Sequence, residues 1–116
     1  MREVEIVDQT RGTMIGDRIA VAETSLTRMV GLLGKKHLAA GQGLWIKPSS
    51  GVHTLGMKFA IDVIGLDRDL KVVRLWERLA PQRITSVSLR LRSVVELPPG
   101  RIAECGVALG DTLQIT

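Results

Sequence analysis

Residues 53–76 (HTLGMKFAIDVIGLDRDLKVVRLW) place three polar side chains, His53, Lys58 and Asp62, in or just before what otherwise has the pattern of a buried strand. A histidine beside a carboxylate can act as a general base that the carboxylate orients. A carboxylate beside a lysine or arginine forms an ion pair instead. The chemistry open to this stretch therefore depends on the partner that Asp62 finds.

Asp62 belongs to a predicted strand, residues 57–66, whose positions beyond Asp62 are apolar on both faces. Such a strand is covered on both sides, and an unpaired carboxylate there costs on the order of several kcal/mol. Lys58 shares its face, but four residues of strand span about 13 Å. Arg28 is the better partner, because a guanidinium binds a carboxylate through two hydrogen bonds. We therefore predict an Arg28–Asp62 pair, which Glu96 can join as a second carboxylate.

The loop before this strand, residues 49–58 (SSGVHTLGMK), supplies further polar groups. We expect it to lie over the Arg28–Asp62 pair. The resulting cluster either is a buried salt bridge that fixes a helix on the sheet or forms a small polar pocket for a ligand or for the chain end of a partner. Its predicted members are Arg28, His53, Thr54, Met57, Asp62 and Glu96.

Other catalytic and metal-binding patterns are weak. His37, His53 and Cys105 do not have the spacing of a zinc site. The serines of PSSGVH lack the GxSxG elbow, and GLLGKK lacks the GxxxxGK[ST] spacing of a phosphate loop. We therefore predict no metal and no cofactor, and the pattern favours a non-catalytic role.

One helix is expected, over residues 25–33. Thr24 or Ser25 can cap its first amides, Gly34 suits the left-handed position beyond its end, and Lys35 and Lys36 complement its negative pole. Its apolar stripe at helical spacing consists of Leu26, Met29, Val30 and Leu33.

Short runs rich in β-branched residues, separated by Gly, Pro and Asp turns, predict a mainly β chain. No β-α-β rhythm is present, and GRIAECG is expected to form a single helical turn. The fold class is thus an antiparallel β-sandwich or partly closed barrel in a single domain, residues 1–116. Strands are expected over residues 4–7, 18–23, 43–48, 57–66, 71–76, 85–93, 94–97 and 111–116.

The ordered segments AET…R..GLLG, GLWI, HTLGMKFAIDVIGLD, VVELPPG and CGVALGD resemble the family called domain of unknown function 192. The resemblance extends from Val21 to Ile115 and implies a small, mainly β fold with no established activity. The sequence departs from the family pattern at HTLGM, where many members carry an aromatic residue before the Met, and at Leu33, where a Met is usual. The matching positions are Arg28, Gly31, Leu32, Met57, Asp62, Glu96, Gly100, Gly106, Gly110 and Asp111.

Composition limits the classes of partner. The net charge is +4, but with one Phe, two Trp and no Tyr there are few platforms for base stacking, so nucleic-acid binding is disfavoured. No apolar run approaches the roughly 18 residues of a membrane span. A single cysteine favours a reducing, cytoplasmic setting, although an export signal removed earlier would leave no trace.

Three functions follow as hypotheses. The favoured one is a non-catalytic binding module with a small polar pocket near Arg28, His53, Asp62 and Glu96, whose partner is an unknown small ligand or protein. The alternative is a small hydrolase or lyase that uses His53 and Asp62 as base and orienter. The third is weak nucleic-acid binding through the basic region Arg74–Arg92. The sequence does not specify an oligomeric state.

Overall fold

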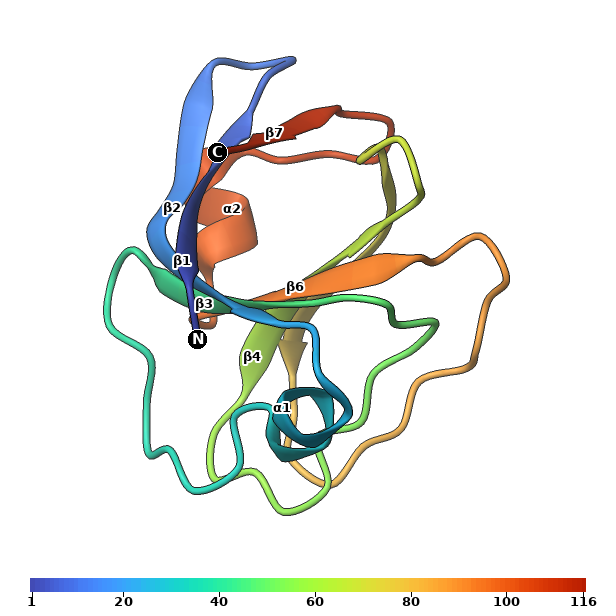
Figure 1. Cartoon of the computed structure of the whole chain (residues 1–116). Helices are drawn as coiled ribbons and strands as arrows, with labels where there is room; N and C mark the ends of the chain where they lie inside the picture. Colours follow the sequence, from blue (N-terminus) through green and yellow to red (C-terminus); the bar gives the residue numbers. More distant parts are fainter.

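A single seven-stranded sheet, curled into a half-barrel, organises the protein (Figure 1). The computed structural model describes residues 1–116, and the strand order is β5-β4-β6-β3-β2-β1-β7. This confirms the predicted mainly β class. The strands are β1 (Glu3–Asp8), β2 (Thr13–Ala22), β3 (Gln42–Ile46), β4 (Ile61–Leu66), β5 (Val72–Leu79), β6 (Ser93–Leu97) and β7 (Leu113–Ile115); the helices are α1 (Ser25–Val30) and α2 (Arg101–Cys105).

The two edges of the sheet meet at one end. The backbone N–H of Val72 donates to Asp111 and that of Leu113 donates to Leu70, which ties the start of β5 to the start of β7. The N–H of Gly110 donates to Val72 as a third link. The sheet is therefore a partly closed barrel rather than a two-layer sandwich.

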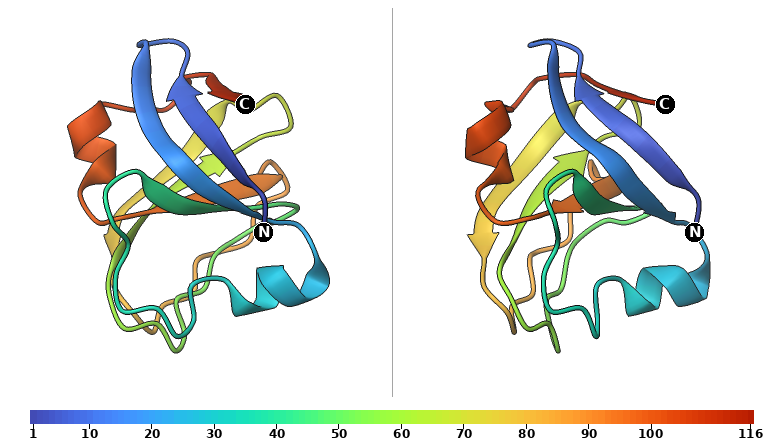
Figure 2. Two further views of the ribbon diagram at one scale, coloured as in Figure 1. Left: turned by 60° about the vertical axis from the view of Figure 1, so that its left-hand side comes forward. Right: turned by 90° about the vertical axis from the view of Figure 1, so that its left-hand side faces the viewer.

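Five of the six strand pairings are antiparallel, and β2 with β3 is the parallel exception. The chain leaves β2, passes through α1 and the loop after it, and returns beside β2 as β3 (Figure 2). One β-α-β crossover therefore exists where the sequence predicted none. The helix and a strand on each side of it were predicted from the sequence, but local patterns do not show that these two strands pair in parallel.

Two apolar clusters cover the two faces of the sheet. The larger fills the concave side together with α2, and it includes Ile64, Val95 and Ile102. The smaller lies on the other side and includes Leu32 and Val63. Every residue of β4 and β6 is buried, as expected for strands covered on both faces.

Three predicted strands differ from the structure by four residues or more. The strand predicted over residues 18–23 is the second part of β2, which begins at Thr13. Residues 57–60 lie outside β4, which begins at Ile61. Residues 85–92 form no strand despite their alternation, and Val87 and Leu89 are 72% and 92% exposed. Their backbone pairs with the loop over residues 50–54 instead, because Thr85 donates to Val52 and Ser88 donates to Ser50.

The helix α1 begins as predicted but ends earlier. Thr24 forms a capping box with Thr27, and Gly31, with a φ of 52°, terminates the helix after Val30. An apolar stripe ordinarily packs on a core, yet α1 buries none of its side chains. As expected, α2 is a single turn that Gly106 closes in the left-handed conformation.

Candidate ligand-binding site

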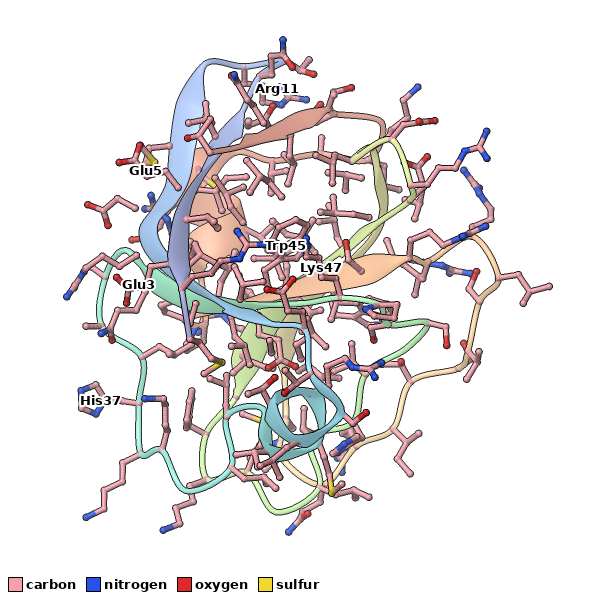
Figure 3. All side chains as sticks on the ribbon, viewed as in Figure 1. Glu3, Glu5, Arg11, His37, Trp45 and Lys47 are labelled. Atoms are coloured by element: carbon pink, nitrogen blue, oxygen red, sulfur yellow. The ribbon has the colours of Figure 1, made fainter.

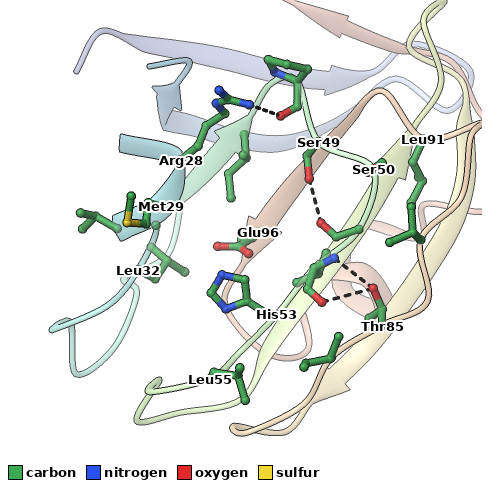
Figure 4. Close-up of a pocket in the computed structure, with 18 of the residues that line it drawn as sticks. Arg28, Met29, Leu32, Ser49, Ser50, His53, Leu55, Thr85, Leu91 and Glu96 are labelled. Carbon is green, nitrogen blue, oxygen red and sulfur yellow. Dashed lines mark hydrogen bonds between the residues drawn. The ribbon is translucent and has the colours of Figure 1, made fainter. Parts of the chain in front are cut away.

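A cavity of about 1000 Å³ lies beneath α1, between the loop after β3 and the segment that leads into β6 (Figure 4). We call it the α1 cavity. Of its 23 lining residues, 12 are hydrophobic, so a ligand inside it would meet a mostly apolar wall. The apolar lining includes Met29, Leu32, Leu33, Val52, Met57 and Leu91.

Two hydroxyl groups join the loops that form the lower wall. The Thr54 hydroxyl donates to the carbonyl of Ala80 (2.7 Å) and accepts from the N–H of Arg83 (2.9 Å). The Thr85 hydroxyl accepts from the N–H of Val52 (2.9 Å). Thr54 is completely buried and does not line the cavity. Thr54, one of the predicted site residues, therefore supports the wall of the α1 cavity and does not reach its interior.

Glu96 forms the polar floor of the α1 cavity. It is in β6, which lies between β3 and β4 in the sheet, and only 3% of it is exposed. Its carboxyl oxygens accept no hydrogen bond and form no ion pair with the protein, and they remain accessible from the open cavity. Burial raises the pKa of Glu96 to about 7. Figure 4 shows the carboxyl group directed into the cavity beside the His53 ring.

Asp62 does not belong to this site. Its two carboxylate oxygens accept the backbone N–H groups of Arg78 and Ile102, both at 2.8 Å. It is fully buried, and it links the end of β5 to the first turn of α2. The prediction that this buried carboxylate needs a partner is confirmed, but its partners are two backbone N–H groups rather than a cation.

The predicted Arg28–Asp62 pair is wrong. Asp62 faces α2 on the concave side of the sheet, whereas α1 and Glu96 lie on the other side. Arg28 is half-buried at the rim of the α1 cavity and donates to the carbonyls of Thr24 and Pro48, both at 3.3 Å. It thus ties α1 to the loop after β3 and leaves the floor open.

His53 and Met57 line the α1 cavity as members of the predicted loop. His53 is exposed, and its backbone bridges Ile84. Because Asp62 faces the opposite side of the sheet, the His53–Asp62 pair required by the hydrolase or lyase hypothesis is absent. Of the six predicted residues, the structure brings four to the cavity: Arg28, His53, Met57 and Glu96.

The apolar part of the site was not predicted from the sequence. Ile84, Val87 and Leu89 line the mouth of the cavity but were assigned to, or next to, a half-buried strand. The proline and the serines around them were the available signal for an irregular segment, but the alternation outweighed it.

A second polar cluster closes the opposite end of the barrel. Asp111 accepts hydrogen bonds from Arg11 Nε (2.6 Å) and from the N–H of Ala108 (3.0 Å), and Asp8 is buried beside it. Burial, and then a hydrogen bond to Asp111, raise the pKa of Asp8. Burial acts to raise the pKa of Asp111 as well, but hydrogen bonds from Asp8 and Arg11 outweigh it and lower that pKa. The cluster joins the β1–β2 turn to the turn before β7.

Cys105 offers no reactive thiol. It is buried between α2 and the concave cluster, and burial raises its pKa. No group of three or more metal-ligating side chains occurs in the structure. Neither of the two helices is long and apolar enough to cross a membrane.

The half-barrel sheet, the short crossover helix and the α1 cavity define a small, mainly β domain. The DUF192 family model (Uncharacterized ACR) matches residues 6–115, and the chain belongs to this family. It is 30% identical over 117 residues to UPF0127 protein PF1050 of Pyrococcus furiosus, covering 94% of this chain and 96% of that relative. The crystal structure of a protein of unknown function from Novosphingobium aromaticivorans DSM 12444 is similar with a TM-score of 0.82 at 19% identity, over 97% of this chain and 83% of that chain.

Proposed function

We propose that this protein is a non-catalytic binding module whose α1 cavity takes a small amphipathic ligand, with an apolar body and an amine group that meets Glu96. One observation carries the proposal. Glu96 is nearly completely buried, is directed into an apolar cavity, and has no partner within the protein. A buried carboxyl group without a partner is costly, and an ammonium group is the partner that relieves this cost most fully.

The remaining lining supports an amine over a carboxylic acid. Glu96 is the sole carboxyl group in the lining, and the Arg28 guanidinium at the rim already donates to two carbonyl groups. An anionic head group at the floor would face a carboxylate whenever Glu96 is ionised. An apolar chain above the floor contributes about 0.8 kcal/mol for each buried methylene.

The test compares hexylamine, hexanol and hexanoate as probes, with thermal unfolding and two-dimensional NMR as readouts. We expect hexylamine to raise the melting temperature and to shift the amide signals around Glu96, because binding to the folded state alone stabilises it. Hexanol should act more weakly, and hexanoate should have no effect. The effect of the amine should grow as the pH rises through about 7, where Glu96 ionises.

Glu96→Gln should abolish the preference for the amine while it retains the weaker response to hexanol. The matched control is Glu77→Gln, because Glu77 is an exposed carboxylate on β5 outside the cavity and makes no ion pair. Equal stabilisation of wild type and Glu96→Gln by hexylamine would contradict the role of Glu96. The absence of any probe response in both readouts would contradict the binding module itself.

A further inference from the structure

The loops around the α1 cavity carry positive charge without acidic residues of their own. Three segments surround the mouth of the α1 cavity, residues 24–41, 47–60 and 80–92, and we call them together the loop pole (Figures 1 and 2). All 12 acidic residues lie outside these segments. The charged residues of the loop pole are all basic: Arg28, Lys35, Lys36, Lys47, Lys58, Arg83, Arg90 and Arg92.

Most of these cations have no partner. Six of them are exposed and take part in none of the ion pairs of the structure. Glu96, the sole carboxyl group of the cavity lining, is buried, and Glu23 at the edge of the loop pole pairs with Lys47. The loop pole therefore presents unneutralised positive charge to the solvent. In Figure 3, His37 of this pole points outward, and Arg11 of the polar cluster with Asp8 and Asp111 lies at the opposite end of the molecule.

The same pole carries protruding apolar side chains. Leu26 and Met29 of α1 are both 67% exposed, and Ile84, Val87 and Leu89 across the cavity mouth are 71%, 72% and 92% exposed. An exposed apolar patch of this kind ordinarily marks an interaction surface. Met29, Ile84, Val87 and Leu89 also line the α1 cavity, so this apolar patch surrounds the opening of the cavity.

We propose that the loop pole docks on an anionic membrane surface, with these apolar side chains inserted among the lipid head groups. A bilayer attracts clustered Lys and Arg through its negative surface potential and accepts apolar side chains to a depth of about 5–10 Å. It is also laterally fluid, so it can contact protrusions on separate loops without a matching rigid shape. In this orientation the mouth of the α1 cavity faces the bilayer.

The first experiment measures co-sedimentation of the full chain with vesicles of phosphatidylcholine alone and with vesicles that also contain phosphatidylglycerol. We expect binding to the anionic vesicles only, and a decline of that binding as salt is added. Lys35→Gln/Lys36→Gln should weaken partitioning about 25-fold, taking about fivefold for each charge removed. The matched control is Arg68→Gln/Lys71→Gln, which removes two exposed charges from the β4–β5 turn outside the loop pole and should bind as wild type does.

The second experiment tests insertion. Leu89→Cys provides an exposed thiol for an environment-sensitive fluorophore, while the native Cys105 is buried and should not react. Emission of the label should shift to the blue on anionic vesicles. Val87→Ser/Leu89→Ser should weaken partitioning without lowering the melting temperature, because both side chains are already exposed in the folded state.

Several results would overturn the proposal. One is equal binding to both vesicle types, or none to either. Another is a control variant that loses as much affinity as Lys35→Gln/Lys36→Gln. Binding to a DNA duplex or to an acidic amphipathic peptide, with no binding to vesicles, would assign the loop pole to a different polyanion and would also refute membrane docking.

Discussion

Replacing Glu96 by Gln should remove a large part of the pH dependence of the protein's stability. In the folded state burial raises the pKa of Glu96 from 4.5 to about 7. Between these two values the folded state holds a proton that the unfolded state releases, so the free energy of unfolding falls as the pH rises. The stabilisation is fully present below about pH 4.5 and is lost as the pH passes through about 7. The two pKa values correspond to about 3 kcal/mol over this window.

Urea unfolding of wild type and Glu96→Gln at pH values from about 4.5 to about 8 measures this effect. The difference in unfolding free energy between the two proteins should change by about 3 kcal/mol across the range, with wild type losing stability as the pH rises. Glu77→Gln is the control for the loss of a carboxylate, because Glu77 is exposed and lies outside the α1 cavity. A wild-type minus Glu96→Gln difference that is independent of pH would refute the assignment of Glu96 as a buried, unpaired carboxyl group.

Three further changes test other parts of the structure through urea unfolding. Asp62→Ala should cost about 2–5 kcal/mol, because the N–H groups of Arg78 and Ile102 lose their acceptor in the protein interior. Asp67→Ala, whose carboxylate also accepts two backbone amides but in an exposed turn, should cost less than about 1 kcal/mol; equal costs would contradict this reasoning. Gly43→Ala should lower the free energy of unfolding by about 1–3 kcal/mol, since a new Cβ would lie 2.6 Å from the backbone oxygen of Glu96. Gly51→Ala is the control and should be nearly neutral, because its Cβ would meet no atom closer than 3.5 Å. Arg28→Ala should lower the free energy of unfolding by less than about 1 kcal/mol, because water can replace its two exposed hydrogen bonds. A loss of several kcal/mol would instead indicate that Arg28 forms a buried ion pair.

The strands that are buried on both faces were the most predictable part of the fold. The apolar runs of β4 and β6 and the turn between β4 and β5 determine their own local structure, so pattern analysis located them. The segment over residues 85–92 was not predictable in this way. Its alternation matches a strand, but its backbone forms hydrogen bonds with another loop rather than with the sheet. The local sequence pattern does not distinguish these two kinds of partner.

For the candidate site, the sequence indicated the right residue types, but the predicted contacts between them were wrong. Asp62 needed compensation, and the sequence suggested side-chain cations because the backbone amides that compensate it belong to elements 16 and 40 residues further along the chain. The sheet also separates Asp62 from Glu96, since each points from its own strand to a different face. Which face a strand turns toward the barrel interior depends on closure of the whole sheet, which short-range periodicity does not encode.

Because α1 is attached only at the surface, the shape of the α1 cavity and the stability of the fold depend on different residues. This helix forms one wall of the α1 cavity, yet the packing that holds the barrel together includes none of its side chains. Substitutions on α1 can therefore alter the preference of the cavity at little cost to folding. The side chains of α1 can thus be changed separately from the scaffold beneath them.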